Sequence, residues 1–206
     1  MKLPFMKPSG ICRVCGAEIE GFAGEFLCDD CSGPHRPRFD RAASAFRLED
    51  AAQRIIYGYK FNGRLYLRDD LVDFLEAAAV ARFDVAEIDL VLPMPSTRFR
   101  RLDRGYNQCA YLAEALAKRL DRKYDASILR RKGHPKRQAG LDEEERRENA
   151  KDSFAVRRPA LVRGRTVLVV DDIQTTGATL SAAAEALKAA GAWRVLTLAL
   201  AKSVKE

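Results

Sequence analysis

The sequence lacks a long apolar run, a secretion signal and a Walker motif, and each absence excludes a class of protein. No stretch approaches the roughly 18 consecutive apolar residues that a membrane-spanning helix needs. Residues 1–11 carry two prolines and no apolar segment of the length a signal peptide requires. The missing Walker motif argues against an ATP-driven motor. We therefore expect a cytoplasmic protein with no membrane insertion.

The composition is that of one globular unit with a basic surface. A chain of 206 residues with 47% hydrophobic content can bury one α/β core and a small appended module. The net charge of +7 suits phosphorylated ligands or nucleic acid. Because the charges are interspersed rather than gathered in one tract, a basic surface with no dedicated partner explains them equally well.

Four of the five cysteines form a repeated Cys-x-x-Cys pattern with twelve residues between the pairs. Two such turns can supply the four thiolates of a tetrahedral structural zinc site. Two disulfides are disfavoured in a cytosolic chain, and a redox-active pair would not need duplication. We expect a zinc ribbon and linker over residues 1–36, tethered to a second domain over residues 37–206. The expected zinc ligands are Cys12, Cys15, Cys28 and Cys31.

Segments of helical period alternate with short apolar runs along the rest of the chain. Helices are expected over residues 49–61, 67–83 and 106–120 and again after residue 180, and strands over residues 42–48, 88–92, 127–129 and 193–200. This alternation predicts a doubly wound parallel sheet. Cys109 shares a helix face with leucine and alanine and has no histidine near it in sequence, so we interpret it as a core residue rather than a nucleophile.

The most informative stretch is residues 167–180, which read VLVVDDIQTTGATL. Four apolar residues in a row suit a strand buried on both faces. The run is expected to stop at Asp171 and Asp172, where a polar loop leads into a helix. In open α/β sheets, ligands bind beyond the carboxyl ends of the strands.

The loop chemistry indicates a phosphate next to a sugar. Gly177 permits close backbone approach, and the threonine hydroxyls lie beside the unpaired amides of a helix N-terminus, which attract anions. The two carboxylates would repel that phosphate, so they should face ribose hydroxyls or a bridging cation. The alternative is a plain strand-to-helix turn with a threonine cap.

This stretch resembles the 5-phosphoribosyl 1-pyrophosphate (PRPP) signature of type I phosphoribosyltransferases, and the whole chain resembles their competence protein F (ComF) branch. The resemblance implies a parallel sheet flanked by helices, with an N-terminal four-cysteine zinc ribbon. It also assigns the ribose contact, the catalytic role in that family, to Asp171 and Asp172. Gln174 stands where the family more often has an apolar or β-branched residue. The implied 5-phosphate site is Thr175, Thr176, Gly177, Ala178 and Thr179.

A second candidate anion site follows the strand at residues 88–92. Residues 96–108 hold four arginines, whose planar forks match phosphate oxygens, before a helix start where cations oppose the dipole. A solvated basic helix start is the alternative. The family shows the Arg-Gly-aromatic-Asn-Gln motif found here at 104–108, although Ser96 and Thr97 depart from its apolar-His pair. The implied pyrophosphate residues are Ser96, Arg98, Arg101, Arg104 and Gly105.

The most polar segment, residues 130–152, has no apolar stripe, although residues 141–149 are expected to form a short helix. Gln-x-x-Leu at 138–141 and Arg-x-x-Asn at 146–149 match patterns of the family. In type I transferases a mobile loop here closes over PRPP, which excludes water; a solvated linker is equally compatible with the composition. The implied mobile-loop cations are Arg130, Arg131, Lys136 and Arg137.

Two functions are compatible with these features. The first is a phosphoribosyltransferase that binds PRPP, or a nucleotide 5-phosphate, with Mg²⁺, and transfers phosphoribosyl to an acceptor with release of pyrophosphate. The second, which the resemblance to the competence protein F branch implies, is a non-catalytic accessory protein of DNA uptake in natural transformation that binds PRPP or a nucleotide and also binds single-stranded DNA or a competence helicase. The Tyr-Lys-aromatic-x-Gly segment at residues 59–63 either stacks on a base or packs the helix end onto the core.

Overall fold

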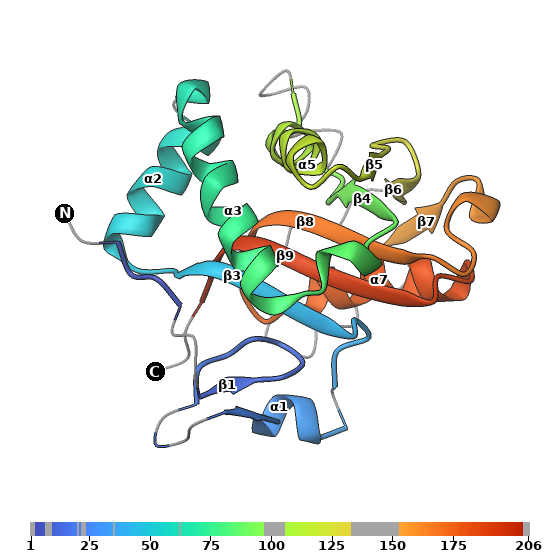
Figure 1. Cartoon of the computed structure of the whole chain (residues 1–206), viewed down its shortest axis with the longest axis horizontal. Coiled ribbons are helices and arrows are strands. Elements are labelled where there is room, and N and C mark those ends of the chain that lie inside the picture. The colour runs from blue at the N-terminus through green and yellow to red at the C-terminus, as the bar shows by residue number, and fades with distance from the viewer. Residues whose placement is uncertain are drawn as a thin grey trace.

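The computed structural model describes residues 3–6, 10–19, 21, 24–34, 36–61, 63–96, 106–132 and 153–203. Its centre is a sheet with strand order β3-β9-β8-β4-β5, and every pairing in it is parallel (Figure 1). The expected α/β class with a parallel sheet is therefore confirmed. The strands are β3 Arg41–Arg47, β4 Leu90–Pro93, β5 Lys123–Tyr124, β8 Thr166–Gln174 and β9 Arg194–Lys202.

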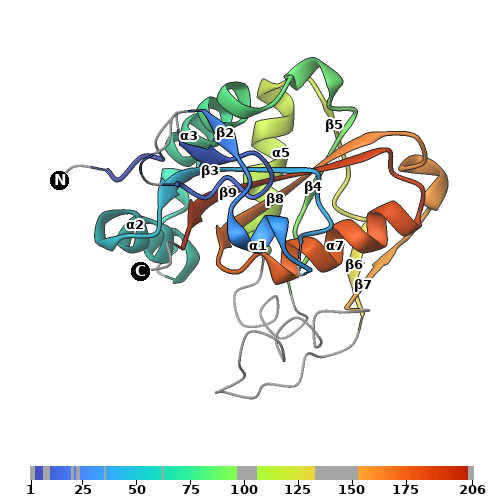
Figure 2. The same ribbon diagram turned by 90° about the horizontal axis from the view of Figure 1, so that it is seen from below.

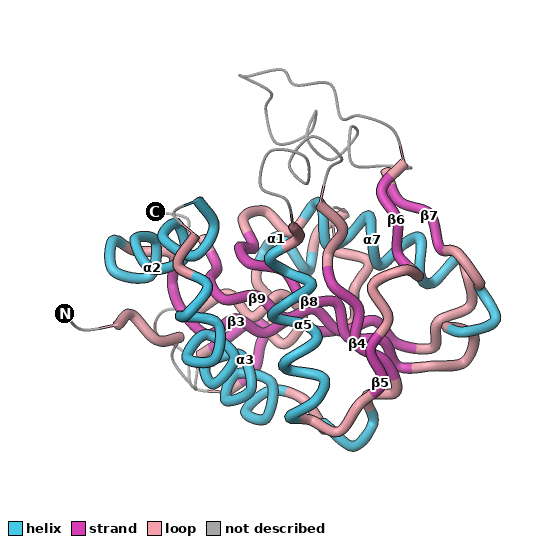
Figure 3. The backbone as a smooth tube through the Cα atoms, turned by 90° about the horizontal axis from the view of Figure 1, so that it is seen from above, coloured by secondary structure: helices cyan, strands magenta, loops and turns pink. Residues whose placement is uncertain are grey.

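Helices cover both faces of this sheet. Helices α2, α3 and α5 lie together over one face of the sheet, as Figure 3 shows from above. Helix α7 covers the opposite face, which is turned toward the viewer in Figure 2. Helices α2, α3 and α5 each begin within two residues of the expected start, and α7 begins slightly before residue 180. The main helices are α2 Asp50–Phe61, α3 Arg68–Arg82, α5 Gln108–Arg119 and α7 Ala178–Ala189, and single 3₁₀ turns are η1 Leu65–Leu67, η2 Val85–Glu87 and η3 Pro159–Leu161.

The side chains of β8 divide the interior into two cores. Leu168 and Val170 pack with α2, α3 and α5, whereas Val167 and Val169 pack with α7. All four are fully buried, as expected for a central parallel strand whose alternate residues point to opposite faces. No helix in the described part of the chain combines the length and apolar character needed to cross a membrane.

Two smaller strand pairs complete the fold. Strands β1 Ile11–Cys12 and β2 Glu25–Phe26 pair in parallel beside helix α1 Asp29–Ser32, whereas β6 Leu129–Arg131 and β7 Phe154–Val156 form an antiparallel pair. The short helix expected over residues 141–149 and the family patterns at 138–141 and 146–149 lie outside the described residues.

The cysteine-containing segment packs directly against the sheet, whereas the sequence suggested a simple tether. The Ala42 amide of β3 donates a hydrogen bond of 2.7 Å to the carbonyl of Val14. Cys12, Val14 and Cys31 belong to the same buried cluster as the α7 face of the sheet. The residues that lead into β3 take part as well, because Phe39 is only 2% exposed and belongs to the same cluster. Apolar burial and backbone bonding therefore both hold the module in place.

Gly16 makes this docking possible, which leads to a test. Its φ is +68°, and a Cβ at this position would lie 2.9 Å from the Ala42 carbonyl oxygen. We expect Gly16→Ala to lower the free energy of unfolding by about 2–4 kcal/mol, because left-handed strain of roughly 1–2 kcal/mol adds to a backbone clash.

The matched control is Gly164→Ala, whose φ is +69° but whose Cβ would meet nothing within 4 Å. Urea denaturation of the two variants separates strain from contact. Equal losses of stability would show that the close approach between Gly16 and Ala42 contributes nothing.

Candidate functional site

The acid pair lies inside strand β8 rather than beyond its end. The strand continues to Gln174 because β9 remains paired with it, with Asp171 opposite Ala199 and Gln174 opposite Lys202. The expectation that the strand stops before the acid pair is therefore wrong. The pair nevertheless sits near the carboxyl edge of the sheet, where ligands bind in folds of this class.

The alternation of faces along β8 is interrupted at the acid pair. Val170 packs in the core under α2, α3 and α5, and so does Ile173, three residues later. A regular strand would place residues three apart on opposite faces. The interruption allows both Asp171 and Asp172 to meet side chains from the α2 and α5 side of the sheet.

Lys60 is the partner of Asp172. Its Nζ lies 2.9 Å from Asp172 Oδ2, with the lysine side chain 14% exposed and the aspartate side chain 13% exposed. The Gln108 side-chain amide donates a 2.5 Å hydrogen bond to the Lys60 carbonyl. Sequence reasoning missed Lys60, although its Tyr-Lys-aromatic segment drew attention. The neighbouring Tyr59 is fully buried, so the expected packing of the helix end is correct for that residue.

Cys109 is the partner of Asp171. Its Sγ donates a hydrogen bond of 3.5 Å to Asp171 Oδ1, and the Asp172 amide donates one of 2.9 Å to the same oxygen. Burial, followed by the charges of Asp172 and Asp171, raises the pKa of the Cys109 thiol well above its usual value. A neutral thiol is a poor nucleophile, so the interpretation of Cys109 as a non-nucleophilic residue holds. One ligand atom from each of the three residues lies within 4.8 Å of the others.

Asp171 has an unusual protonation equilibrium. The pKa of its carboxyl is raised from 3.8 to about 7, mainly by burial and next by the charge of Asp172. Hydrogen bonds from the Asp172 amide and Cys109 and the charge of Lys60 lower the pKa and offset part of this rise. Two carboxylates so close repel one another unless a positive partner is present. The donor set, two carboxylates at a strand end, fits a hard cation such as Mg²⁺ or the hydroxyls of a sugar.

The threonine loop forms a helix N-terminus, as expected. Gly177 has a φ of +78° and precedes α7, and the Ala178 amide donates to the hydroxyl of Thr176 at 3.3 Å. The Ser181 amide donates to the Gly177 carbonyl at 2.8 Å. The amides of Thr179 and Leu180 lie in the first turn, where an α-helix supplies no backbone partner, and can face an anion. Gln174 is 2% exposed and packs beneath this loop, with Nε2 at 3.4 Å from the position of a Cβ on Gly177.

The expected pyrophosphate segment begins and ends beside β8. The Met94 amide donates to the Val170 carbonyl at 2.8 Å, and Asn107 Nδ2 donates to the Met94 carbonyl at 3.1 Å. Ser96 is partly buried just after this anchor. The other expected residues, namely Arg98, Arg101, Arg104 and Gly105, lie outside the described part of the chain.

The expected mobile-loop cations lie in two different settings. Arg130 and Arg131 are on strand β6 rather than in a loop, and the Arg131 guanidinium lies 5.3 Å from the centre of the Phe154 ring on β7. Pairing with β7 holds the backbone of both residues, and the cation–π contact holds the Arg131 side chain. Lys136 and Arg137 are not among the described residues.

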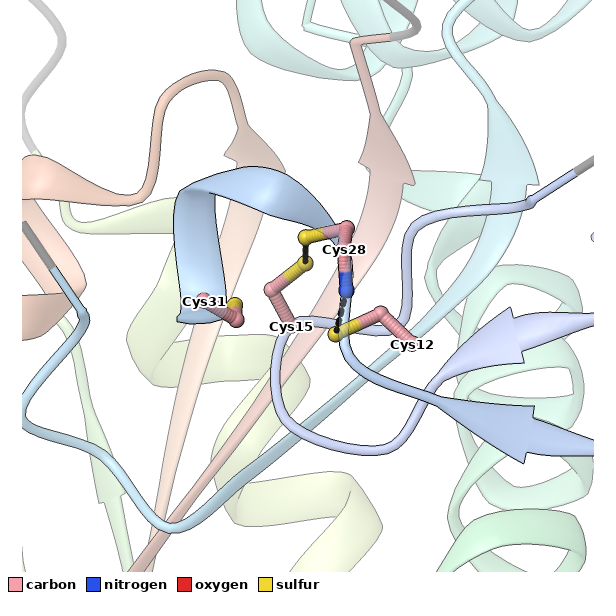
Figure 4. A group of neighbouring side chains, drawn as sticks. All are labelled: Cys12, Cys15, Cys28 and Cys31. Atoms are coloured by element: carbon pink, nitrogen blue, oxygen red, sulfur yellow. Dashed lines mark hydrogen bonds between the residues drawn. The ribbon is translucent and has the colours of Figure 1, made fainter. Parts of the chain in front are cut away.

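The four N-terminal cysteines converge as the spacing predicted (Figure 4). Their sulfur atoms all lie within 4.8 Å of one another, and Cys15 Sγ is 3.6 Å from Cys28 Sγ. Zn–S bonds of about 2.3 Å give a tetrahedron edge of about 3.8 Å. The Cys28 amide lies 3.5 Å from Cys12 Sγ, where it can donate to a thiolate. The cluster is compatible with a zinc ribbon.

The hydrogen bond between Cys12 and Cys15 changes the pKa values of both thiols in a way that favours a bound metal. The hydrogen bond with Cys12 raises the pKa of Cys15 to about 12, and the hydrogen bond with Cys15 lowers the pKa of Cys12. Without a cation, negative charge on one sulfur therefore opposes ionisation of its neighbours. A divalent cation removes that repulsion, since thiolates are its preferred ligands here.

Comparison with known proteins agrees with these features. Residues 107–204 match the family model described as a phosphoribosyl transferase domain. Competence protein F of Haemophilus influenzae is 28% identical over 199 residues, which cover 93% of this chain and 84% of that protein. DNA utilization protein YhgH of Escherichia coli K12 is 26% identical over 211 residues, covering 95% and 91%.

Among solved structures, glutamine phosphoribosylpyrophosphate amidotransferase from B. subtilis aligns with a TM-score of 0.46 at 18% identity. The alignment covers 69% of this chain and 30% of that longer chain.

Zinc binding can be tested with the fifth cysteine as the control. We expect Cys15→Ser to abolish stoichiometric zinc, measured by elemental analysis of purified protein, and to lower stability, because a structural site needs all four thiolates. Cys109→Ser should retain one zinc per chain, since Cys109 lies with the acid pair. Equal zinc content in Cys15→Ser and the wild type would contradict the four-thiolate site.

The raised pKa of Asp171 predicts a pH-dependent stability. The folded state holds this proton more tightly than the unfolded state, so the contribution of Asp171 to stability falls as pH rises from about 4 to about 7. We expect Asp171→Asn, which keeps an oxygen acceptor for the Asp172 amide, to be more stable than the wild type at pH 8 by about 1–3 kcal/mol.

This difference should shrink toward zero as the pH falls below the ordinary carboxyl pKa of 3.8, because the carboxyl then becomes protonated in the unfolded state as well. Urea denaturation across this range, without Mg²⁺ or ligand, provides the measurement. A difference that does not change with pH would mean that packing, rather than ionisation, causes it.

Proposed function

Because the chain is a homologue of competence protein F and of DNA utilization protein YhgH with the type I phosphoribosyltransferase fold, we propose that it binds PRPP with Mg²⁺ and transfers phosphoribosyl to an acceptor. The observation that carries the proposal is the order of groups at the end of β8. Two carboxylates at Asp171 and Asp172 are followed, within five residues, by the glycine that opens α7. This order matches ribose hydroxyls next to a 5-phosphate.

Different residues bind different groups of PRPP. Asp171 and Asp172 accept hydrogen bonds from the ribose hydroxyls, and the residues from Thr175 to Thr179 hold the 5-phosphate with hydroxyls and helix amides. Ser96 and the arginines after it receive the pyrophosphate, and Lys136 and Arg137 add positive charge for it. The zinc ribbon plays a structural part.

The reaction would need positioning more than covalent help from the protein. The bond between the anomeric carbon and pyrophosphate breaks with its electron pair leaving on pyrophosphate, while the acceptor forms a bond to that carbon and loses a proton. Magnesium supplies charge neutralisation for the leaving group. The side chains hold the sugar and the polyanion in line and stabilise the developing charge.

Calorimetry with PRPP and Mg²⁺ provides the test. We expect Asp171→Asn combined with Asp172→Asn to weaken binding at least tenfold, because each lost hydrogen bond to a charged group is worth about 1.5–3 kcal/mol. A matched control exists in Asp69→Asn combined with Asp70→Asn, which alters an adjacent acidic pair exposed on α3. Unchanged PRPP binding in the first double variant would refute the assignment.

A pyrophosphate-release screen against nucleobases and amines then asks whether transfer follows binding. Release with one acceptor class, lost in the Asp171 and Asp172 double variant, identifies both the activity and the acceptor.

The second candidate function is a nucleic-acid-binding accessory role, which is favoured by the names of the relatives, competence protein F and DNA utilization protein YhgH, and by one surface feature. Tyr57 and Phe61 of α2 stack at 5.3 Å and are 46% and 56% exposed, and Tyr66 nearby in sequence is 75% exposed. Exposed aromatic rings on a basic protein suit unstacked bases. Salt-sensitive binding of single-stranded DNA that is lost on zinc chelation, without pyrophosphate release from PRPP, would favour this role.

A further inference from the structure

The acid pair already holds a cation, and the protein itself supplies it. Lys60 Nζ lies 2.9 Å from Asp172 Oδ2, and both side chains are largely withdrawn from water. Lys60 is in the last turn of α2, outside the residues 107–204 that match the phosphoribosyl transferase model. The ammonium therefore comes from a part of the chain that the match to the phosphoribosyl transferase family does not cover.

The backbone of Lys60 is fixed on both sides. Gln108, 3% exposed at the start of α5, donates a 2.5 Å hydrogen bond to the Lys60 carbonyl. Tyr59, the preceding residue, has no exposed surface and belongs to the core under α2, α3 and α5. A long lysine side chain loses conformational entropy when it is held in one place. Attraction to Asp172 offsets that loss because the pair is shielded from solvent.

We propose that Lys60 is a positioning residue that acts as the resident cation of the acid pair, and that a divalent cation binds Asp172 by displacing the ammonium. This inference rests on the proposed PRPP-magnesium function. Mg²⁺ binds oxygen at about 2.0–2.1 Å. On the same carboxylate oxygen it would lie no more than about 5 Å from an ammonium at 2.9 Å, and two cations so close in a shielded site repel strongly. The Lys60 ammonium and a divalent cation therefore cannot bind the Asp172 carboxylate at the same time.

Displacement has a consequence for the free protein. Lys60 keeps the carboxylates compensated when no ligand is bound, so the site does not depend on a metal to remain folded. It also lowers the affinity of the site for a bare metal ion. A ligand that brings its own cation, such as a magnesium-bound pyrophosphate ester, gains further contacts at the phosphate loop that a metal ion alone does not.

The test measures Mn²⁺ affinity of the zinc-loaded full chain by electron paramagnetic resonance, at pH 8.5 and without PRPP. Mn²⁺ prefers the oxygen ligands that Mg²⁺ uses, and this pH is above the raised pKa of Asp171. We expect Lys60→Met and Lys60→Gln to bind Mn²⁺ about tenfold more tightly than the wild type, because the ammonium that competes for Asp172 is gone. Lys60→Arg should bind like the wild type.

Two further variants locate the effect. Lys60→Met combined with Asp172→Asn should lose the gain, because the carboxylate that the ammonium vacates is gone. Lys118→Met removes a lysine that pairs with Glu114 at 3.4 Å on an exposed helix surface and should leave Mn²⁺ affinity unchanged. Merely structural damage at position 60 would weaken metal binding rather than strengthen it.

Equal or weaker Mn²⁺ binding by both Lys60→Met and Lys60→Gln overturns the inference, and so does a gain that persists without Asp172. Calorimetry of wild-type protein with PRPP and Mg²⁺ separates the two proposals. If the wild type binds PRPP but the Lys60 variants show no gain in Mn²⁺ affinity, only this inference fails. If the wild type does not bind PRPP, the proposed function fails, whatever the Mn²⁺ result.

Discussion

Two adjacent carboxylates in a buried strand need a positive partner, and the arrangement around β8 satisfies that need. Asp171 and Asp172 repel one another and lose hydration, so at least one of them must be protonated or paired. The protein does both: the pKa of Asp171 is raised to about 7, and Asp172 meets Lys60. The position of α2, the bond from Gln108 and the contact with Cys109 all serve this one electrostatic requirement.

The acid pair depends in turn on how β8 is built. In its first half, successive residues point alternately into the two cores. In its second half, this alternation is interrupted, so that Val170 and Ile173 pack in the same core, although β9 remains paired with the strand. The interruption is what allows two consecutive side chains to meet partners from one side of the sheet. The same continuous segment then opens α7, so the carboxylates and the helix amides keep a fixed separation.

The cysteine module is part of the body of the protein rather than a separate attachment. Glu25 of β2 pairs with Arg41 of β3 and with Arg82 of α3, and Arg82 also donates to the Cys12 carbonyl at 3.3 Å. Burial lowers the pKa of Arg82, the neighbouring charge of Arg41 lowers it further, and Glu25 opposes both. A structural metal in this module would therefore also stabilise the outer edge of the sheet that β3 forms.

The sequence by itself determined the elements whose causes are local: four cysteines at metal-ligand spacing, helices with one apolar face, and an apolar strand leading to acids, threonines and a glycine. Only the tertiary structure decided that Lys60 meets Asp172, that Cys109 meets Asp171 and that Gly16 lies against Ala42. These contacts join residues 112, 62 and 26 positions apart. No periodicity or propensity encodes such pairs, because they arise when helices and strands pack around a common core.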